Sequence, residues 1–308
     1  MSTAHNERGA AMIIVLGLVA IVAAWAANAA YEDMLSLRQA DNAQLSLRAE
    51  LACLSALKLA RLALEEDGKN SQVDSLEEDW AMPATPFPLD DGLVMGEIED
   101  SNRFFNLNDL VNDQGLADRY SVAQVKRLFT QLDLDANMVD ALIDWMDADN
   151  KPFGVGGVEA DGYYDRKYSI KNARLDRWNE LRMVIGFDAK TVKILSNVVT
   201  VRPVYAGVKT LININTAKKP VLQMLFPKMT DGDADAMIEA RPYNDLTAIN
   251  NQPWVAGGDL LHLGVNSDMF FLHAQASFGH IHWRENYLLE RKSGRLTLLW
   301  RERIIWQP

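Results

Sequence analysis

An apolar segment near the N-terminus constrains this chain more than any other feature. Residues 10–30 carry no charge, and an apolar helix of about twenty residues is long enough to cross the hydrocarbon core of a bilayer. Arg8 precedes the segment, and Glu32 and Asp33 follow it. Because basic flanks stay on the cytoplasmic side, the sequence predicts a single-pass anchor with residues 1–9 in the cytoplasm and the bulk of the chain outside.

A secretory signal peptide is the main alternative, because Ala27-Asn28-Ala29 offers a small-residue cleavage site. A simple bitopic anchor is another. The apolar run, however, exceeds the usual core of about 7–15 residues in a signal peptide. Residues 31–66 also contain neither Gly nor Pro and are rich in strong helix formers. The sequence therefore favours a membrane helix that continues directly into a soluble helix.

The overall charge limits the partners of the chain. Lys and Arg total 31 and Asp and Glu total 42, which gives a net charge of −11. An acidic protein repels phosphate backbones, so general nucleic-acid binding is not expected. Cys53 is the only cysteine among the 308 residues, so no intrachain disulfide can form. A chain of this length has room for two domains.

Strand patterns occur on both sides of a long helical region. Residues 93–99 form one expected strand, and a helical block of about 165 residues follows it. Three more strands are expected at 270–278, 281–290 and 296–305, with a Ser293-Gly294 turn between the last two. The early strand needs partners, and the late strands are the nearest candidates. The pattern therefore predicts one α+β domain with a large helical insertion.

The helical block contains an internal echo. Residues 106–108 and 213–215 are both Asn-x-Asn, and each leads into a helix, a turn and a second helix. Such units resemble helix–hairpin–helix modules, which often bind DNA backbones. A DNA-binding hairpin is expected to be basic. The second unit carries Lys218 and Lys219, but the first carries Asp109 and Asp113. We therefore interpret both units as packing and interaction surfaces.

Gly9 directly before an apolar helix looks like the processing site of type IV prepilin-like proteins, with the cut between Gly9 and Ala10. The whole chain is similar to the K-type minor pseudopilins of the type II secretion system, the general secretion pathway protein K family. The resemblance rests on the order of several stretches, none of them unique alone. They are Arg8-Gly9-Ala10, Trp80-Ala81-Met82-Pro83, Thr85-Pro86-Phe87, Leu89-Asp90-Asp91-Gly92, Ile98-Glu99-Asp100, Arg103 to Val111, Asp144 to Asp149, and Ile212 to Ala217.

The resemblance implies a type IV pilin-like fold, in which a long N-terminal helix packs on an antiparallel sheet, and an assembly protein rather than an enzyme. It implies cleavage by prepilin peptidase, N-methylation of Ala10, an inner-membrane anchor and a periplasmic main domain. It also implies a place at the pseudopilus tip with the I-, J- and H-type minor pseudopilins, initiating and capping assembly for protein export across the outer membrane. The secretin and secreted proteins are further candidate contacts.

Ile14 separates this chain from most type IV pilins and pseudopilins. Those proteins carry Glu at the fifth mature position, where it is thought to neutralise the N-terminal amine of a neighbouring subunit. Counted from Ala10, the fifth residue here is Ile14, a departure that the K-type family shares. An unpaired carboxylate in hydrocarbon is expensive, and a subunit with no pilin above it has no amine to pair. The alternative is that Ile14 merely faces lipid, and the context of Gly9 favours the tip.

The expected division of the chain follows from these patterns. Residues 1–9 form a leader peptide, and residues 10–30 form the transmembrane part of the N-terminal helix. Residues 31–100 hold the periplasmic helix, a linker and the first strand of the pilin-like domain. Residues 101–265 form the inserted helical domain with its two hairpin-like units, and residues 266–308 supply the C-terminal strands.

The densest polar constellation, Asp144 to Asn150, is followed by a Gly-rich loop with three more carboxylates. Calcium takes about six to eight oxygen ligands, so clustered carboxylates with flexible glycines suit it, although the spacing does not fit an EF-hand. The family binds calcium in its helical domain, and the resemblance implies this loop as the site. The side-chain ligands expected are Asp147, Asp149, Glu159, Asp161 and, less strongly, Asp165. A solvated acidic loop is the alternative.

Two other functions stay open from the sequence. One is a periplasmic or anchored helix–hairpin–helix protein that binds DNA, and the other is a membrane-anchored hydrolase. No G-x-S-x-G, Walker A or G-x-G-x-x-G motif is present. No nucleophile with an adjacent base is visible either, so the sequence predicts no catalytic residue.

Overall fold

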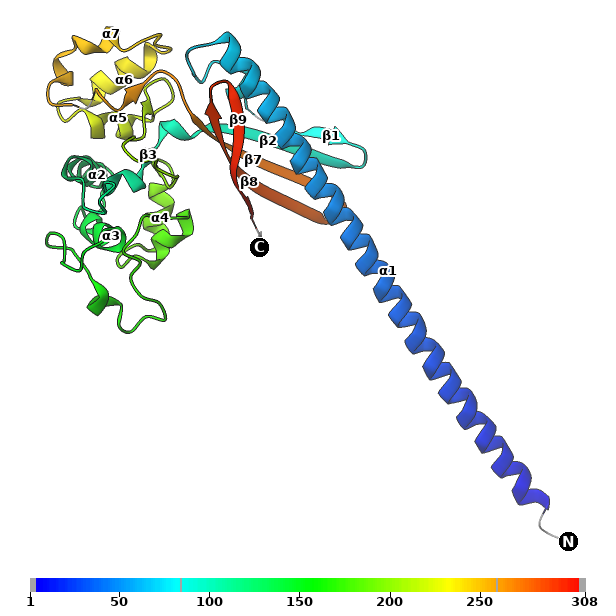
Figure 1. The fold of residues 1–308 in the computed structure, drawn as a ribbon. Coiled ribbons are helices and arrows are strands. Elements are labelled where there is room, and N and C mark those ends of the chain that lie inside the picture. The colour runs from blue at the N-terminus through cyan, green and yellow to red at the C-terminus, as the bar shows by residue number, and fades with distance from the viewer. Residues whose placement is uncertain (1–3, 84, 259, 305–308) are drawn as a thin grey trace.

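The computed structural model describes residues 4–83, 85–258 and 260–304. A rod-like helix, α1 (Ala4–Asn70), dominates its shape, and the free half of this helix points away from the rest of the molecule (Figure 1). Its 67 residues correspond to a length of about 100 Å at the usual rise per residue. Within the described residues, α1 is the one helix long and apolar enough to cross a membrane. The prediction of a single unbroken helix is confirmed.

Five antiparallel strands form the main sheet, in the order β1-β2-β7-β8-β9. Their bounds are β1 (Phe87–Leu89), β2 (Gly92–Asp100), β7 (Met269–Phe278), β8 (Ile281–Lys292) and β9 (Arg295–Arg303). Strand β2 pairs with β7 along its whole length, from Gly92 opposite Phe278 to Asp100 opposite Phe270. The early strand therefore finds its partner among the late strands, as predicted, and the chain between them leaves the sheet and returns to it.

Strand β1 was not expected. The sequence predicted its first strand at residues 93–99, yet Phe87–Leu89 also forms a strand and pairs with β2 through a turn at Asp90 and Asp91. β1 lies at the edge of the sheet, where a proline is tolerated because its missing N–H need not face a neighbouring strand.

The C-terminal half of α1 packs on one face of this sheet. Small and aliphatic side chains of α1 are buried there, among them Ala49, Cys53 and Leu64, and they meet aromatic residues such as Phe270 and Tyr287. Small residues allow close approach of helix and sheet, and the aromatic rings fill the remaining space. Burial of this face is what holds the rod to the body.

A buried carboxylate, Glu285 of β8, fixes the helix against the sheet. It is 1% exposed and accepts hydrogen bonds from Trp283 Nε1 at 2.9 Å, from the Tyr287 hydroxyl, and from Arg301 Nε at 3.0 Å. Arg301 also reaches Glu50 of α1 at 2.5 Å. Burial alone would raise the pKa of Glu285, but the hydrogen bonds, above all those from Arg301, outweigh it and hold this pKa below its usual value. Removing one partner of such a pair typically costs about 3–5 kcal/mol.

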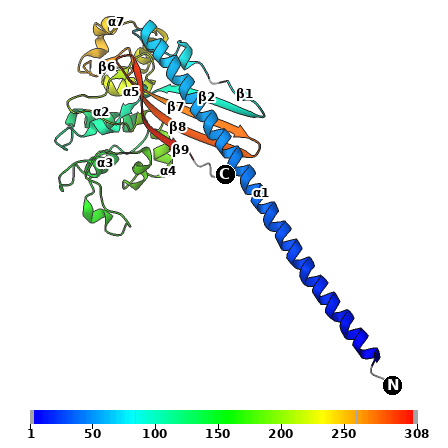
Figure 2. The same cartoon turned by 45° about the vertical axis from the view of Figure 1, so that its right-hand side comes forward.

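The chain between β2 and β7 builds a second hydrophobic core of its own. It contains two units, each closed by a parallel pair of two-residue strands. The first unit (residues 105–200) runs from β3 (Phe105–Asn106) to β4 (Val199–Thr200), and the second unit (residues 212–264) runs from β5 (Ile212–Asn213) to β6 (Leu263–Gly264). In both views, the free half of α1 points away from these units (Figure 1, Figure 2).

Helices fill each unit. The α-helices of the first are α2 (Arg119–Gln131), α3 (Met138–Met146) and α4 (Ala189–Leu195), and those of the second are α5 (Lys219–Leu225), α6 (Asp231–Glu239) and α7 (Thr247–Asn250). Short 3-10 turns lie at Asp79–Ala81, Ser101–Arg103, Leu107–Leu110, Ala160–Tyr163, Trp178–Met183 and Pro253–Val255. The two units pack together mainly through α2 and α5.

The Asn-x-Asn motifs explain the echo in the sequence. In the first unit, Asn108 Oδ1 accepts from Leu175 N and Asn108 Nδ2 donates to Leu175 O, both at 2.8 Å. In the second unit, Asn215 makes the same two bonds with Tyr243, at 2.7 and 2.9 Å. The first Asn of each motif accepts from the backbone N–H of the second. Each motif therefore holds a distant backbone segment inside the unit with one buried amide.

Candidate metal centre

Helix α3 presents a row of carboxylates at the end of the first unit. Its apolar side chains are buried in the core of that unit, while Asp140 and Asp144 are one turn apart and Asp147 caps the C-terminus. Residues at this spacing lie along one side of a helix. All three carboxylates are buried residues, so the loop that follows α3 must cover them.

The Gly-rich loop lies directly on this row. Phe153 N donates to Asp144 Oδ1 at 2.8 Å, and Gly156 N donates to Asp140 Oδ2 at 3.2 Å. A Cβ at Gly154 would lie 2.4 Å from Asp140 Oδ2, and one at Gly157 would lie 2.6 Å from Asp144 Oδ2. Glycine is required at these positions because the loop backbone touches the carboxylates, which is the reason for the Gly-rich composition.

Three carboxylates converge beneath the loop. Asp144, Asp147 and Glu159 each offer an oxygen within 4.8 Å of the others. Among the described residues, Asp144 Oδ2, Asp147 Oδ1 and both oxygens of Glu159 are buried without a hydrogen-bond partner. Buried carboxylates left this way are costly unless a metal or another cation binds them. The donor set, entirely of oxygen, fits a hard cation such as Ca²⁺.

The pKa values of the clustered carboxyl groups also favour a bound cation. Burial first, and then the neighbouring charges of Asp149, Asp144 and Glu159, raise the pKa of Asp147 to about 7. Burial and the charges of Asp144 and Asp149 also raise the pKa of Glu159. Asp147 lies at the C-terminus of α3, where the negative end of the helix dipole disfavours an anion. A bound cation would relieve all of these penalties together.

The structure brings together only some of the ligands expected from the sequence. Asp147 and Glu159 belong to the cluster, and Asp149 lies close enough to raise the pKa of both. Asp161 and Asp165 lie at exposed positions and are not part of this cluster, so their role as ligands stays a prediction. The cluster instead includes Asp144, which the sequence did not single out as a ligand. Asp144 opens the acidic constellation and lies three residues before Asp147 on the helix, a spacing that identifies it once α3 is known to end at Met146.

The N-terminal positions singled out in the sequence lie on the free half of α1. A Cβ at Gly9 would meet no other atom within 4 Å, so packing within the chain gives no reason for glycine there. Ile14 is 63% exposed in the isolated chain. Both positions are available to a membrane, an enzyme or a neighbouring subunit.

Comparison with known proteins identifies the family. Two models of type II secretion system protein K match residues 103–204 and 212–267, close to the first and second units. The type II secretion system protein K of Pseudomonas aeruginosa is 35% identical over 251 residues, which cover 77% of this chain and 73% of the relative. This chain belongs to the protein K family of the type II secretion system. The protein K of Pectobacterium carotovorum is 28% identical over 96% of each chain.

A solved structure of the protein K family agrees in fold. The crystal structure of the GspK-GspI-GspJ complex from the type 2 secretion system of enterotoxigenic Escherichia coli matches with a TM-score of 0.76 and 27% identity, over 87% of this chain and 100% of the matched chain. The expected α+β, pilin-like fold with a helical insertion is confirmed. As a K-type minor pseudopilin, the chain is a structural component of the secretion system and not an enzyme, which excludes the membrane-anchored hydrolase.

Proposed function

We propose that this chain forms the tip of the pseudopilus, where it initiates and caps filament assembly for export across the outer membrane. The observation that carries the proposal is the position of the two helical units. They lie on the side of the sheet away from the free half of α1, at the end of the molecule opposite the N-terminus (Figure 1). A further subunit stacked on this end would clash with the two units. The apolar Ile14 supports the same conclusion, because it gives no carboxylate to pair with the amine of a further subunit.

Processing at the N-terminus is part of the proposal. Prepilin peptidase would cut between Gly9 and Ala10, and Ala10 would then be N-methylated. The cut would leave residues 10–30 as a single-pass inner-membrane anchor and the body in the periplasm. The absence of any packing reason for Gly9 supports a recognition role for it. Intact mass of the membrane-extracted protein tests this: a chain from Ala10 plus one methyl group, lost without the peptidase, is the expected result. A chain starting at Ala30 would contradict it.

The I- and J-type minor pseudopilins are the proposed partners of α1. Large apolar side chains remain exposed on the helix away from the sheet, and successive ones are 10, 4, 8 and 3 residues apart, each step being a sum of threes and fours. They are Leu37, Leu47, Leu51, Leu59 and Leu62. Such a stripe on a soluble segment indicates a helix partner, and the protein K relative of known structure is part of a complex with GspI and GspJ. The H-type pseudopilin, the secretin and secreted proteins are proposed as further contacts.

A charge in this stripe tests the assembly role. We expect Leu51→Glu to abolish co-purification of the I- and J-type partners from cells and to stop secretion, because a carboxylate would be buried against an apolar helix. Leu76→Glu is the matched control, since Leu76 is also exposed but lies in the linker after α1. Normal partner capture and normal secretion by Leu51→Glu would overturn the proposed interface.

Calcium is the proposed ligand of the acidic cluster, held by Asp144, Asp147, Asp149 and Glu159, with backbone carbonyls completing the shell. The orphaned buried oxygens of three of these residues support the assignment. When bound, the ion would neutralise the carboxylates and tie the loop to α3, so its proposed role is structural.

DNA binding, the main rival, is not favoured by the surface of the second unit. Lys219 forms ion pairs with Asp231 and Asp235, at 3.6 and 2.9 Å, and Lys218 lies over the ring of Phe104. The basic residues that would face a phosphate backbone are therefore engaged within the chain. We expect no DNA binding by the full chain in detergent; binding with a steep salt dependence would revive the rival.

A further inference from the structure

A cleft separates the first unit from the sheet. Its volume is about 480 Å³, within the range of about 300–1,000 Å³ typical of ligand sites, which often lie at domain boundaries. Phe271 of β7 and Trp300 of β9 line one side, and Trp178 and Thr200 of the first unit line the other. The proposed assembly function makes no use of this space.

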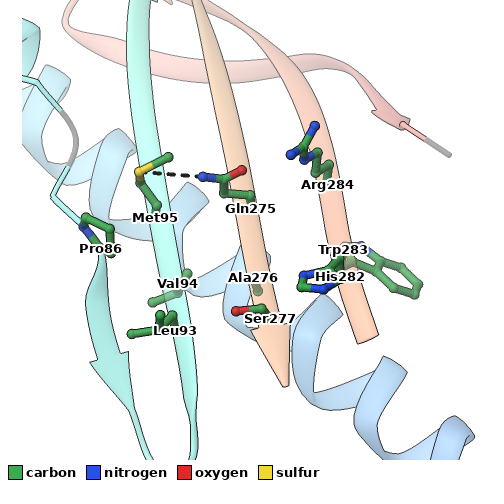
Figure 3. A pocket seen from close by; sticks show the side chains of 10 residues that line it. All are labelled: Pro86, Leu93, Val94, Met95, Gln275, Ala276, Ser277, His282, Trp283 and Arg284. Carbon is green, nitrogen blue, oxygen red and sulfur yellow. Dashed lines mark hydrogen bonds between the residues drawn. The ribbon is translucent and has the colours of Figure 1, made fainter. Parts of the chain in front are cut away.

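Aromatic rings form a strip along the sheet side of the cleft. The ring centroids of Phe271 and Trp300 lie 6.1 Å apart, and His273 stacks on Phe271 with ring planes 26° apart. A second hollow on the sheet has a volume of about 180 Å³. In it Gln275 of β7 reaches Met95 of β2, and the rings of His282 and Trp283 come from β8 (Figure 3). Flat rings at the rim of a cavity suit a ligand with flat apolar faces.

The charges in the cleft are already balanced. Each ionised side chain on its lining has an opposite partner within the described part of the chain. The pairs are Arg177 with Glu302 (3.8 Å), Asp176 with Lys171 (2.8 Å), and Glu99 with Arg103 (3.1 Å) and His273 (3.4 Å). A charged ligand would have to compete with these pairs, so the cleft favours a neutral ligand. Amides and hydroxyls complete the lining, at Asn179, Ser196, Thr200 and Asn286, and such groups bind hydroxyl-rich molecules because they both donate and accept.

We propose that this cleft binds a neutral saccharide. A sugar ring has flat C–H faces that stack on aromatic side chains and equatorial hydroxyls that bond to amides and hydroxyls at its edge. It carries no charge to disturb the ion pairs. An apolar ligand would leave the amides unpaired, which costs affinity, whereas a saccharide uses both kinds of surface. The ligand would lie between the first unit and β9, so its binding would tie these two parts together.

Ligand-observed saturation-transfer NMR tests the proposal on the full chain, in a detergent that contains no sugar. The probes are the trimer of N-acetylglucosamine and cellotriose, which separate an N-acetylated cell-wall type of chain from a plain glucose chain. We expect saturation transfer to one or both at millimolar concentration. Trp300→Ala should weaken binding about tenfold, the value of one stacked ring, and Trp300→Phe should retain most of it. Met95→Ala, on the same sheet but outside the cleft, is the matched control.

Three results would overturn the proposal. The first is no transfer to either sugar from a chain whose circular dichroism shows the native fold. The second is binding that survives both Trp300→Ala and Trp178→Ala, which would place the sugar elsewhere. The third is binding of a neutral tryptophan-containing tripeptide in place of the sugars, which would make the cleft a peptide site. Because none of these results depends on partner capture, they are independent of the tip assignment.

Discussion

In the first helical unit Asn108 bridges to Leu175, 67 residues away, whereas in the second unit Asn215 bridges to Tyr243, 28 residues away. The bridge is the same in both units, and so is the parallel pairing of two-residue strands that closes each one. The extra chain of the first unit holds the Gly-rich loop and the carboxylate cluster. The two units therefore share the asparagine bridge and the parallel strand pair, and only the first unit adds the candidate metal centre.

The carboxylates of the two units differ in what surrounds them. In the second unit, Asp233 accepts from Thr230 and Asp231 accepts from Gln223, and these bonds lower the pKa of both residues. In the first unit, burial and neighbouring anions raise the pKa of Asp147 and Glu159. The same residue type thus marks a solvated helix start in one unit and a buried cluster with unpaired oxygens in the other. Acidic density alone is therefore not the signal for a candidate metal site; burial of carboxylates without hydrogen-bond partners is.

The largest expected effect on stability comes from removing the asparagine bridge that both units share. Asn108→Ala and Asn215→Ala each remove several hydrogen bonds and leave buried backbone groups unpaired. We expect each change to lower the free energy of unfolding by about 3 kcal/mol, measured by chemical denaturation of the full chain in detergent. A large loss for one change and none for the other would break the equivalence of the two units. Asn250→Ala, at an exposed position at the end of α7, is the control.

Calcium removal should affect the first unit and leave the second unit unchanged. We expect a chelator to abolish the hydrogen-exchange protection of residues 153–163 and leave that of residues 231–239 unchanged, because only the first unit holds the cluster. At a calcium concentration of about 100 times Kd, the ion should contribute about 2.7 kcal/mol to stability. Equal protection of the loop with and without calcium would contradict the metal assignment.

Two isosteric changes sharpen the choice of ligands. Asp144→Asn should weaken calcium binding at least about tenfold, because it removes a charge from the buried cluster. Asp161→Asn is the matched control, since Asp161 is exposed and outside the cluster, and it should leave the affinity nearly unchanged. Isothermal titration calorimetry distinguishes them, and the reverse order of effects would restore the ligand set expected from the sequence.

The smallest expected effect is on the pH dependence of the chelated protein. The pKa of Asp147 is about 7 in the folded chain and about 4 when unfolded. Between these values the folded state binds more protons, so the stability of the calcium-free protein should fall as pH rises from about 4 to 7. Asp233, whose pKa is lowered, contributes stability that is lost only as pH falls below about 4. A thermal melt series with a chelator, compared with Asp147→Asn, checks the sign; stability that rises across this window would contradict the burial of Asp147.

The sequence was most informative where a pattern repeats along one element. The long helix and strands β2, β7, β8 and β9 were predicted because their periodicities are local and sustained. The pairs β3–β4 and β5–β6 were not, because strands of two residues have no periodicity and depend on segments about fifty to a hundred residues apart. The membership of the acidic cluster was hard to predict for a related reason: which carboxylates come together depends on where α3 ends and how the following loop folds back, which spacing alone does not give.

The contact of Glu285, Arg301 and Glu50 has a mechanical consequence. It sets the angle of α1 about its own axis, since a slip of one residue would turn the helix by about 100° and pull Glu50 away from Arg301. The long helix and the sheet that it packs on therefore turn together as one rigid piece. A partner that binds the exposed leucines of α1 thereby also sets the direction in which the helical units face.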